Sequence, residues 1–476
     1  MGRELIKRNR QVVLLDGTRS EDKGLDAILL LLLEVLHRDE NNIAGVEKFT
    51  LRETKIHHCI GCFNCWTRTP GICIHTDRGV DILQAILKSD IVILFTPVVF
   101  GGYSSELKKI MDRLLPTTVP FFKKAYGETH HPSRYSKLPR FITIGVCSTV
   151  QNNFARCFKI LAGRNAANGN WDYAVEVVNS IHSSAQLSSQ FQRLFRKADK
   201  MGPGLPRYNE LALLQKNIKP TSKISRGNRK ALLIVGSPKI KSPSTSSMLG
   251  VYLAERLEKY GWKVDSLTLG ANLLHKKGQD DLCSAMDKAD LLLIVFPLYI
   301  DALPFLLTKA FEVIYFHREK VKNKQPKNLL AIVNNGFPEP HQNAVALSIC
   351  YNFAAQCGIH WAGGLPLGAG EALCGGQPLT SGFKRHRSCG WIWHPPRRHL
   401  IRALNITALS LTQGKPIPEK AVQLTARSPI PFTPFALWAW LVIQLGRLLW
   451  KKEASENGIR EVDMLDKPYG RIISGS

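Results

Sequence analysis

An internal repeat constrains the fold of this chain more than any other sequence feature. Residues 89–100 (Ser-Asp-Ile-Val-Ile-Leu-Phe-Thr-Pro-Val-Val-Phe) recur two hundred residues later as residues 289–300 (Ala-Asp-Leu-Leu-Leu-Ile-Val-Phe-Pro-Leu-Tyr-Ile). Each copy is a continuous apolar run that breaks at a proline, which is typical of a parallel strand covered on both faces. The repeat therefore predicts two related halves.

Other apolar runs complete the pattern in each half. First strands are expected at 12–17 and 232–237, helices at 26–36 and 248–260, and further buried strands at 141–146 and 329–333. Strands that alternate with helices predict an α/β fold with a doubly wound parallel sheet, whose ligands lie beyond the carboxyl ends of the strands. We expect domains at 1–200 and 229–415, a Pro-, Gly- and Lys-containing linker at 201–228, and a C-terminal tail at 416–476.

Four cysteines follow the spacing C-x2-C-x2-C-x7-C: Cys59, Cys62, Cys65 and Cys73. Four thiolates in one short loop can surround an iron-sulfur cluster, with Gly61 and Gly71 supplying turns. A zinc site with four cysteines and a loop without metal remain open from the spacing alone. The first copy has about twenty more residues than the second between its first strand and its proline loop, so the cysteine segment is expected to be an insertion in copy one.

Charge and cysteine usage restrict the partners. The net charge is +26, with basic clusters at 219–230, 317–327 and 384–402. These clusters lack the interleaved aromatic residues of a nucleic-acid module, so we expect no nucleic-acid partner, and a positive field that attracts phosphorylated cofactors such as NADPH. The other seven cysteines are scattered and no secretory signal opens the chain, which favours a cytoplasmic protein with reduced thiols.

Three loops of copy two, each after an expected strand, could touch one planar ligand. The first is rich in hydroxyls and precedes a helix, the second contains the proline, and the third is an Asn-Gly turn. Hydroxyls and amides at a helix N-terminus beside a lysine can bind a terminal phosphate, although an ordinary helix cap explains the hydroxyls as well. The candidate ligand-binding residues are Ser237, Lys239, Ser244, Thr245, Ser246, Pro297, Leu298, Tyr299, Ile300, Asn335 and Gly336.

These loops resemble those of the NADPH-dependent FMN reductases and multimeric flavodoxins. In copy two the resemblance rests on 236–239, 244–246 and 296–299, and in copy one on 96–105, 107–108 and 112–113. It implies two tandem flavodoxin-like domains, FMN and NAD(P)H as cofactors, and flavin-binding roles for Thr96, Pro97, Val98, Phe100 and Gly101 of copy one. The cysteine segment is similar to that of iron-sulfur flavoproteins, which implies a [4Fe-4S] cluster beside FMN.

Copy one departs from this family at its phosphate loop. It has Asp16, Glu21 and Asp22 where the family has a Ser-Pro-Arg type of loop, and carboxylates repel a phosphate dianion. We therefore expect a pseudo-dimer in which the cysteine segment of copy one faces a flavin held by copy two. Family members are usually oligomers, so further self-association is also implied.

The predicted function is an FMN-dependent NAD(P)H oxidoreductase that passes electrons, through an iron-sulfur centre, to a small-molecule or protein acceptor. Two alternatives are a flavodoxin-type electron carrier without a small-molecule substrate of its own, and a zinc-stabilised binding module without flavin. The sequence singles out no catalytic residue. His57, His58, His130 and His131 fit surface or capping positions better than ligand or proton-donor roles.

The C-terminal tail contains an apolar, Trp-rich run at 431–452 followed by lysines. Its clean apolar stretch is shorter than the roughly twenty residues that span a bilayer. We expect this helix to dock on the protein itself, with peripheral contact to a membrane as the alternative.

Overall fold

The computed structural model describes residues 10–38, 42–148, 152–198, 202, 208–222, 227–239, 242–322, 325–380, 385–386, 390–391, 397–427 and 434–470. Parts of the expected linker, of the basic clusters at 219–230, 317–327 and 384–402, and of the expected apolar run at 431–452 lie outside these residues.

The first domain is an α/β unit on a parallel sheet of strand order β2-β1-β3-β6-β7. Strand β3 is buried at every residue, as its unbroken apolar run predicts. The elements are β1 (Arg10–Asp16), α1 (Leu25–Leu36), β2 (Ile43–Thr50), α2 (Asn64–Thr67), α3 (Arg78–Lys88), β3 (Ile91–Pro97), α4 (Ser105–Met111), η2 (Asp112–Thr117), β4 (Lys123–Ala125), β5 (Glu128–His130), β6 (Arg140–Cys147), α5 (Asn152–Gly169), β7 (Tyr173–Asn179) and α6 (Ser184–Ala198).

The second domain repeats this plan with strand order β9-β8-β10-β11-β12. In each domain's own numbering the order is 2-1-3-4-5, which is the flavodoxin-like order of a doubly wound sheet. Its elements are β8 (Lys230–Val235), α8 (Thr245–Lys259), β9 (Lys263–Thr268), η3 (Ala271–Leu274), α9 (Lys276–Lys288), β10 (Leu291–Pro297), α10 (Phe305–Lys320), β11 (Asn328–Asn334), η4 (Pro340–Asn343), α11 (Ala344–Gln356), β12 (His360–Leu367), α12 (Gly370–Leu373), β13 (Arg385–His386), β14 (Gly390–Trp391), α13 (Arg398–Thr412) and α14 (Glu419–Thr425). The predicted fold is thus confirmed.

The largest difference in loop length between the two domains is the cysteine segment of the first domain. Between β2 and α3 the first domain has residues 51–77, whereas between β9 and α9 the second domain has only residues 269–275. The difference is the twenty residues inferred from the repeat. A small hairpin of β4 and β5 follows η2 in copy one and has no counterpart among the described residues of copy two.

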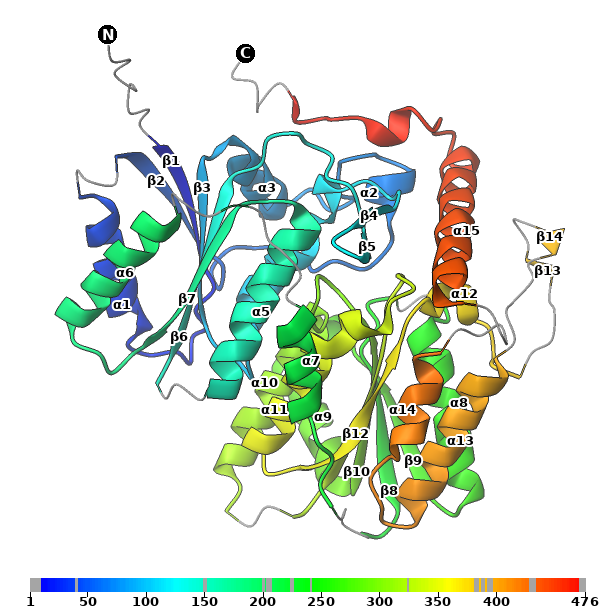
Figure 1. Cartoon of the computed structure of the whole chain (residues 1–476). Helices are drawn as coiled ribbons and strands as arrows, with labels where there is room; N and C mark the ends of the chain where they lie inside the picture. The colour runs from blue at the N-terminus through cyan, green and yellow to red at the C-terminus, as the bar shows by residue number, and fades with distance from the viewer. Residues whose placement is uncertain are drawn as a thin grey trace.

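Equivalent helices of the two domains pack against each other. Helix α4 contacts α10, and α5 contacts α11, so the domains are related as the two halves of a pseudo-dimer (Figure 1). One apolar core runs through both domains across this interface. Buried polar contacts cross it too: the amide and hydroxyl of Ser105 donate to Glu312, and Arg164 donates to Asp301.

Two segments outside the sheets differ from the expected organisation. The expected linker contains helix α7 (Tyr208–Asn217), whose Leu211 and Leu214 are buried in the core shared by the domains. After α14, helix α15 (Phe435–Glu456) runs along the molecule and the chain then crosses the first domain to η5 (Asp463–Leu465) (Figure 1). No helix in the described part of the chain has the length and apolarity that crossing a membrane requires.

Candidate functional site

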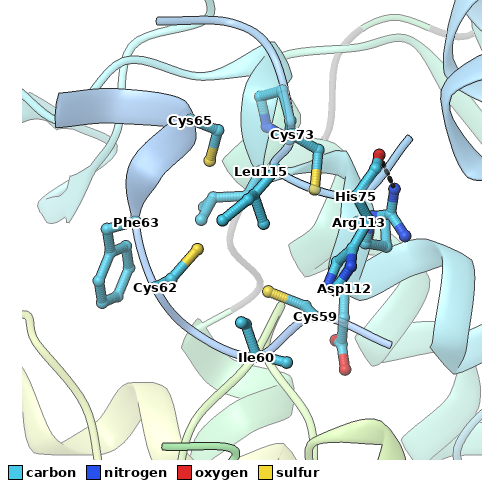
Figure 2. A pocket seen from close by; sticks show the side chains of 12 residues that line it. Cys59, Ile60, Cys62, Phe63, Cys65, Cys73, His75, Asp112, Arg113 and Leu115 are labelled. Atoms are coloured by element: carbon cyan, nitrogen blue, oxygen red, sulfur yellow. Dashed lines mark hydrogen bonds between the residues drawn. The ribbon is translucent and has the colours of Figure 1, made fainter. Parts of the chain in front are cut away.

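The four cysteines of the insertion line one pocket. Figure 2 shows the sulfur atoms of Cys59, Cys62, Cys65 and Cys73 directed into a common space. The pocket encloses about 330 Å³, including its open mouth. Cys65 lies in the short helix α2, one turn from Cys62. The four residues predicted as metal ligands thus lie close together in the structure.

Left-handed backbone conformations bend the segment around this pocket. Gly61 has φ +64° and Gly71 has φ +80°, as expected for turns that favour glycine. Phe63, which lacks that freedom, also has φ +54° at the start of α2. A strained non-glycine residue at this place indicates that the surrounding contacts hold the loop in one shape.

Arg113 ties the two ends of the cysteine segment together. Its guanidinium donates to the carbonyl of His57 at 2.7 Å and to both carboxylate oxygens of Asp77 at 3.0 Å. The Asp77 carboxylate also caps helix α3 by accepting from the amide of Gly79. Burial raises the pKa of Asp77, but the hydrogen bonds from Arg113 and His57 outweigh this and hold that pKa well below its ordinary value. Apart from the family resemblance at 112–113, no sequence signal predicts this clamp.

Burial dominates the electrostatics of two of the four thiols, Cys59 and Cys65. It raises the pKa of Cys59 to about 12 and also raises the pKa of Cys65. Thiols in such surroundings stay protonated unless a cation stabilises the thiolate, and a metal centre does this. Burial, together with the neighbouring His75 and His57, lowers the pKa of His58 to about 4, so His58 is neutral at pH 7.

The thiols surround a volume rather than a single point. Among the residues that the structure describes, no three His, Cys, Asp or Glu side chains are close enough together to share one metal ion. A cubane cluster takes one thiolate per iron and needs a ring of cysteines around a space of its own size. The donor set and its pocket fit such a cluster.

The pocket lies directly against the second domain. A Cβ atom on Gly61 would sit 2.3 Å from the hydroxyl of Tyr299 and 3.4 Å from Pro238, so the backbones approach closely here. The ammonium of Lys239 lies 5.3 Å from the ring centre of Phe63. The cysteine segment of copy one thus faces both the hydroxyl loop and the proline loop of copy two, while a flavin at these loops stays a prediction.

A buried ion pair connects the pocket to the proline loop. Lys108 and Asp112 pair one turn apart on the chain, and Asp112 lines the cysteine pocket. Lys108 donates to the carbonyl of Tyr299 at 2.8 Å, and Asp112 accepts from the amide of Phe305 at 2.9 Å. The pair therefore fixes the second domain's proline loop relative to the thiols.

The hydroxyl loop of copy two leads into a well-capped helix. Ser244 accepts from the amide of Ser247 and Ser247 accepts from that of Ser244, which forms a capping box at the start of α8. Ser237 accepts from the amide of Lys239, and Ser246 accepts from Asn334. The hydroxyls are thus engaged within the protein, but the helix N-terminus and Lys239 leave a positive end at this loop.

The turn after β11 presents a buried acceptor. Asn335 donates to the carbonyl of Glu339, while its Oδ1 atom has no hydrogen-bond partner among the described residues. Gly336 next to it is exposed, and a Cβ there would meet nothing within 4 Å. An unpaired buried acceptor beside open space can accept from a ring N–H of a ligand.

The corresponding loops of copy one serve the interface. Phe100 is buried against Phe311 and Phe353 of the second domain, and a Cβ on Gly101 would lie 2.9 Å from the side chain of Asn352. Thr96 accepts from the amide of Ser104. Pro97 is the last residue of β3 beside β6, and the amide of Val98 donates to the carbonyl of Val146 in β6. A flavin-binding role for Thr96, Pro97, Val98, Phe100 and Gly101 stays a prediction, and the backbone around Phe100 and Gly101 is already covered by protein.

Carboxylates fill the phosphate loop of copy one. The buried Asp16 accepts from the amide and hydroxyl of Thr18, and Arg52 and Lys48 lie close to it. Arg19 pairs with Asp22 at 2.6 Å and reaches Glu312 of the second domain at 3.2 Å. Helix α1 starts after Gly24 without a side-chain cap. Arg19, Lys48 and Arg52 thus already have anionic partners within the protein.

The C-terminal helix and tail cover the cysteine segment. The indole of Trp450 on α15 packs edge-on against Phe63 and Trp66, with ring centres 5.1 and 5.2 Å apart. Arg134 donates to the carbonyls of Met464 and Asp466, and a Cβ on Gly71 would meet Pro468 at 2.6 Å. Docking of the tail on the protein is thus confirmed, whereas its contact with the metal-type loop was not foreseen.

The fold and its loops define a tandem flavodoxin-like protein with a four-cysteine pocket at the contact between its domains. Residues 11–128 match the model of the NADPH-dependent FMN reductase family.

Curated relatives match parts of the same region. An iron-sulfur flavoprotein of Methanocaldococcus jannaschii is 35% identical over 92 residues, which are 19% of this chain and 47% of the relative. An iron-sulfur flavoprotein of Archaeoglobus fulgidus is 34% identical over 106 residues, which are 22% of this chain and 44% of the relative. The chain spans less than half the length of each of these relatives.

Two solved structures are also similar in part. An FMN-dependent NADH-azoreductase of Bacillus anthracis in complex with FMN is 15% identical and covers 40% of this chain and 98% of its own, with a TM-score of 0.29. An NAD(P)H:quinone oxidoreductase of Methanothermobacter marburgensis is 14% identical and covers 39% of this chain and 100% of its own, with a TM-score of 0.25.

Proposed function

We propose that the protein is an FMN-dependent NAD(P)H oxidoreductase in which FMN is held by the second domain and a [4Fe-4S] cluster by Cys59, Cys62, Cys65 and Cys73 of the first. The observation that carries this proposal is the contact of Gly61 with Tyr299 and Pro238. It places the thiol pocket beside the loops of copy two that resemble flavin-binding loops. Electrons would need to pass only across this contact.

The second domain supplies groups that suit FMN. The capped N-terminus of α8 and Lys239 favour a phosphate dianion, and Asn335 Oδ1 offers an acceptor for the flavin ring. Strand β10 lies between β8 and β11 in the sheet. The backbone of 297–300 at its carboxyl end therefore lies between the loop that leads to α8 and the turn that contains Asn335. FMN, when bound, supplies the hydride chemistry, while the protein binds and orients the reactants.

The cysteine pocket suits a cluster better than zinc. Zinc needs four ligand atoms around one point at about 2.3 Å from the metal, whereas these thiols line a larger space. The apolar neighbours Ile60, Leu115 and Ile74 would exclude water from the cluster. The names of the relatives, iron-sulfur flavoproteins, agree with this assignment.

The remaining parts of the proposal follow from charge and redox state. A net charge of +26 favours encounter with the phosphates of NAD(P)H. All described cysteines are free thiols, which fits a reducing compartment such as the cytoplasm. The acceptor is either a small molecule or a protein.

Anaerobic reconstitution with FMN, iron and sulfide tests the proposal. We expect one flavin and four irons per chain, flavin absorption together with a broad band that dithionite bleaches, and steady NAD(P)H consumption with an artificial acceptor. Cofactors without NAD(P)H consumption, but with reduction by a partner reductase, would indicate an electron carrier instead. Stoichiometric zinc in a colourless protein that does not bind FMN would contradict the proposal.

A further inference from the structure

Helix α15 has two faces of different environment. Trp438, Ala439, Val442 and Ile443 are buried, and they fasten the helix to the rest of the protein. Farther along the same side, Gly446 lies close to the ring of Phe122 of the first domain. Figure 1 shows α15 as a long helix at the side of the molecule, with one flank turned away from both sheets. The inner face explains how the helix docks.

The outer face remains apolar although it is exposed. Leu437, Trp440, Leu441 and Leu448 have exposed fractions of 49%, 55%, 36% and 65%. At 100° per residue these four side chains fall within one side of the helix, opposite the buried set. Large exposed apolar residues that gather on one helix face mark a binding surface.

Basic residues share this outer side. By the same helical spacing, the exposed Arg447 lies on the side of the four apolar residues, and so does Lys451, which pairs with Glu461 at 2.7 Å. The whole chain carries a net charge of +26. Leucine and tryptophan next to Arg and Lys, on a helix that lies along a protein surface, form the pattern of an interfacial helix.

The size and charge of this face decide between its possible occupants. Four side chains of one convex helix offer far less area than the roughly 800 Å² per partner of a standard protein interface. A second copy of this chain would also bring a further strongly positive charge to the same place. An anionic lipid surface requires neither a large complementary face nor an opposing protein charge.

We propose that the outer face of α15 docks the protein on an anionic membrane surface, with Leu437, Trp440, Leu441 and Leu448 inserted at the headgroup level. No helix in the described residues can cross a membrane, so the attachment is peripheral. Because Trp450 of the same helix packs on Phe63 and Trp66, docking also brings the cysteine segment close to the lipid. This proposal rests on the fold and surface alone and holds with or without flavin or cluster.

Vesicle sedimentation of the full-length protein tests the proposal. The wild type is expected to sediment with mixed phosphatidylglycerol and phosphatidylcholine vesicles, and to stay in solution with pure phosphatidylcholine vesicles. Because each basic residue near an anionic surface contributes about fivefold to binding, raising the salt concentration should release the protein. Trp440→Glu and Leu448→Glu should each lower the partition coefficient about tenfold or more.

Leu409→Glu is the control, since Leu409 on helix α13 is also an exposed leucine, with an exposed fraction of 43%. It should bind vesicles as the wild type does. Leu437→Ser and Leu441→Ser remove apolar surface without adding charge and should weaken binding as well, so the test holds even if a Glu variant unfolds.

Three outcomes would overturn the proposal. The wild type could ignore anionic vesicles, or the outer-face variants could bind as tightly as Leu409→Glu. The third outcome is a wild-type oligomer in size-exclusion chromatography that Trp440→Glu converts to a monomer, which would make this face a contact between copies of the chain.

Discussion

The two loops that follow the first strands occupy the same place in two related domains but contain opposite chemistry. In the first domain, Asp16 and the pair of Arg19 with Asp22 fill the loop. In the second domain, the loop leads into the capping box of α8 and contains Lys239, whose ammonium faces Phe63. Carboxylates therefore occupy this loop in the copy that contains the cysteine insertion, whereas the other copy has the positive end of a capped helix at the same place.

The contact between the domains brings the cysteine segment of the first domain next to the loops of the second. Equivalent helices pair across the interface. The cysteine segment thereby reaches the loops of copy two, where Tyr299 meets Gly61. Neither domain alone would contain the complete site.

Loss of a cysteine should have the largest effect. Cys59→Ser removes one of four ligands, so we expect almost complete loss of iron after reconstitution, with FMN binding retained. Cys147→Ser is the control, because Cys147 lies at the end of β6, outside the pocket. Iron analysis and FMN titration measure both effects, and a Cys59→Ser protein with full iron content would refute the ligand assignment.

The phosphate loops can be compared by one substitution in each. Lys239→Met should weaken FMN binding about tenfold to a hundredfold, because it removes a charged partner of the phosphate. Arg19→Met should leave FMN affinity unchanged, since Arg19 is bound to Asp22 and Glu312. Quenching of FMN fluorescence measures the affinity, and a larger loss in Arg19→Met would reverse the roles of the two domains.

An acid titration should expose the contribution of Glu128, which belongs to the hairpin of β4 and β5 in copy one. Burial raises its pKa, but hydrogen bonds from His341 and Arg164 outweigh this and lower the pKa to about 2. A carboxyl group with a lowered folded-state pKa stabilises the fold above its unfolded pKa near 4.5 and loses this effect as the pH falls toward 2. The stability at stake is about 3 kcal/mol.

Glu128→Gln should therefore be less stable than the wild type near neutral pH and should lose less stability between pH 5 and pH 2. Denaturant unfolding at several pH values measures this. Glu53→Gln, at an exposed position of the loop after β2, should follow the wild type. Parallel curves for Glu128→Gln and the wild type would show that Glu128 does not link acid to unfolding.

The smallest expected effects come from two glycine substitutions that separate backbone strain from the contact with Tyr299. Gly61→Ala and Gly24→Ala both place a side chain at positive φ, at +64° and +91°, which costs about 1 kcal/mol each. Only the Cβ of Gly61→Ala would meet Tyr299, because Gly24 has nothing within 4 Å. Thermal unfolding should therefore show a larger loss in Gly61→Ala than in Gly24→Ala, and rapid mixing with NAD(P)H should show slower cluster reduction in Gly61→Ala alone. Equal cluster reduction in both variants would remove Tyr299 and Gly61 from the electron path.

Much of the fold could be predicted because its signals are local. The buried runs that became β3 and β10, and the proline after each, specify strands and strand-end loops without knowledge of the rest of the chain. The length difference between the copies located the insertion. The four cysteines were likewise close enough in sequence to predict a shared pocket.

The parts that escaped prediction depend on contacts between distant residues. The clamp of Arg113 on Asp77 joins residues 36 positions apart, and Arg134 holds the carbonyl of Met464 330 positions away. The composition around helix α7 predicts a linker, because its short apolar pattern indicates a docked helix only when Leu211 and Leu214 are known to pack in the shared core. Sequence periodicity carries no information about such partners.

The central claim is that a flavin in the second domain lies beside a cluster in the first. The most direct measurement is a crystal structure of the full-length chain loaded with FMN, iron and sulfide, with anomalous data at the iron edge. We expect four iron positions among Cys59, Cys62, Cys65 and Cys73, and a flavin whose phosphate lies at the start of α8 and whose ring lies along 297–300. A flavin at the Asp16 loop of the first domain, or a single zinc ion among the cysteines, would contradict it.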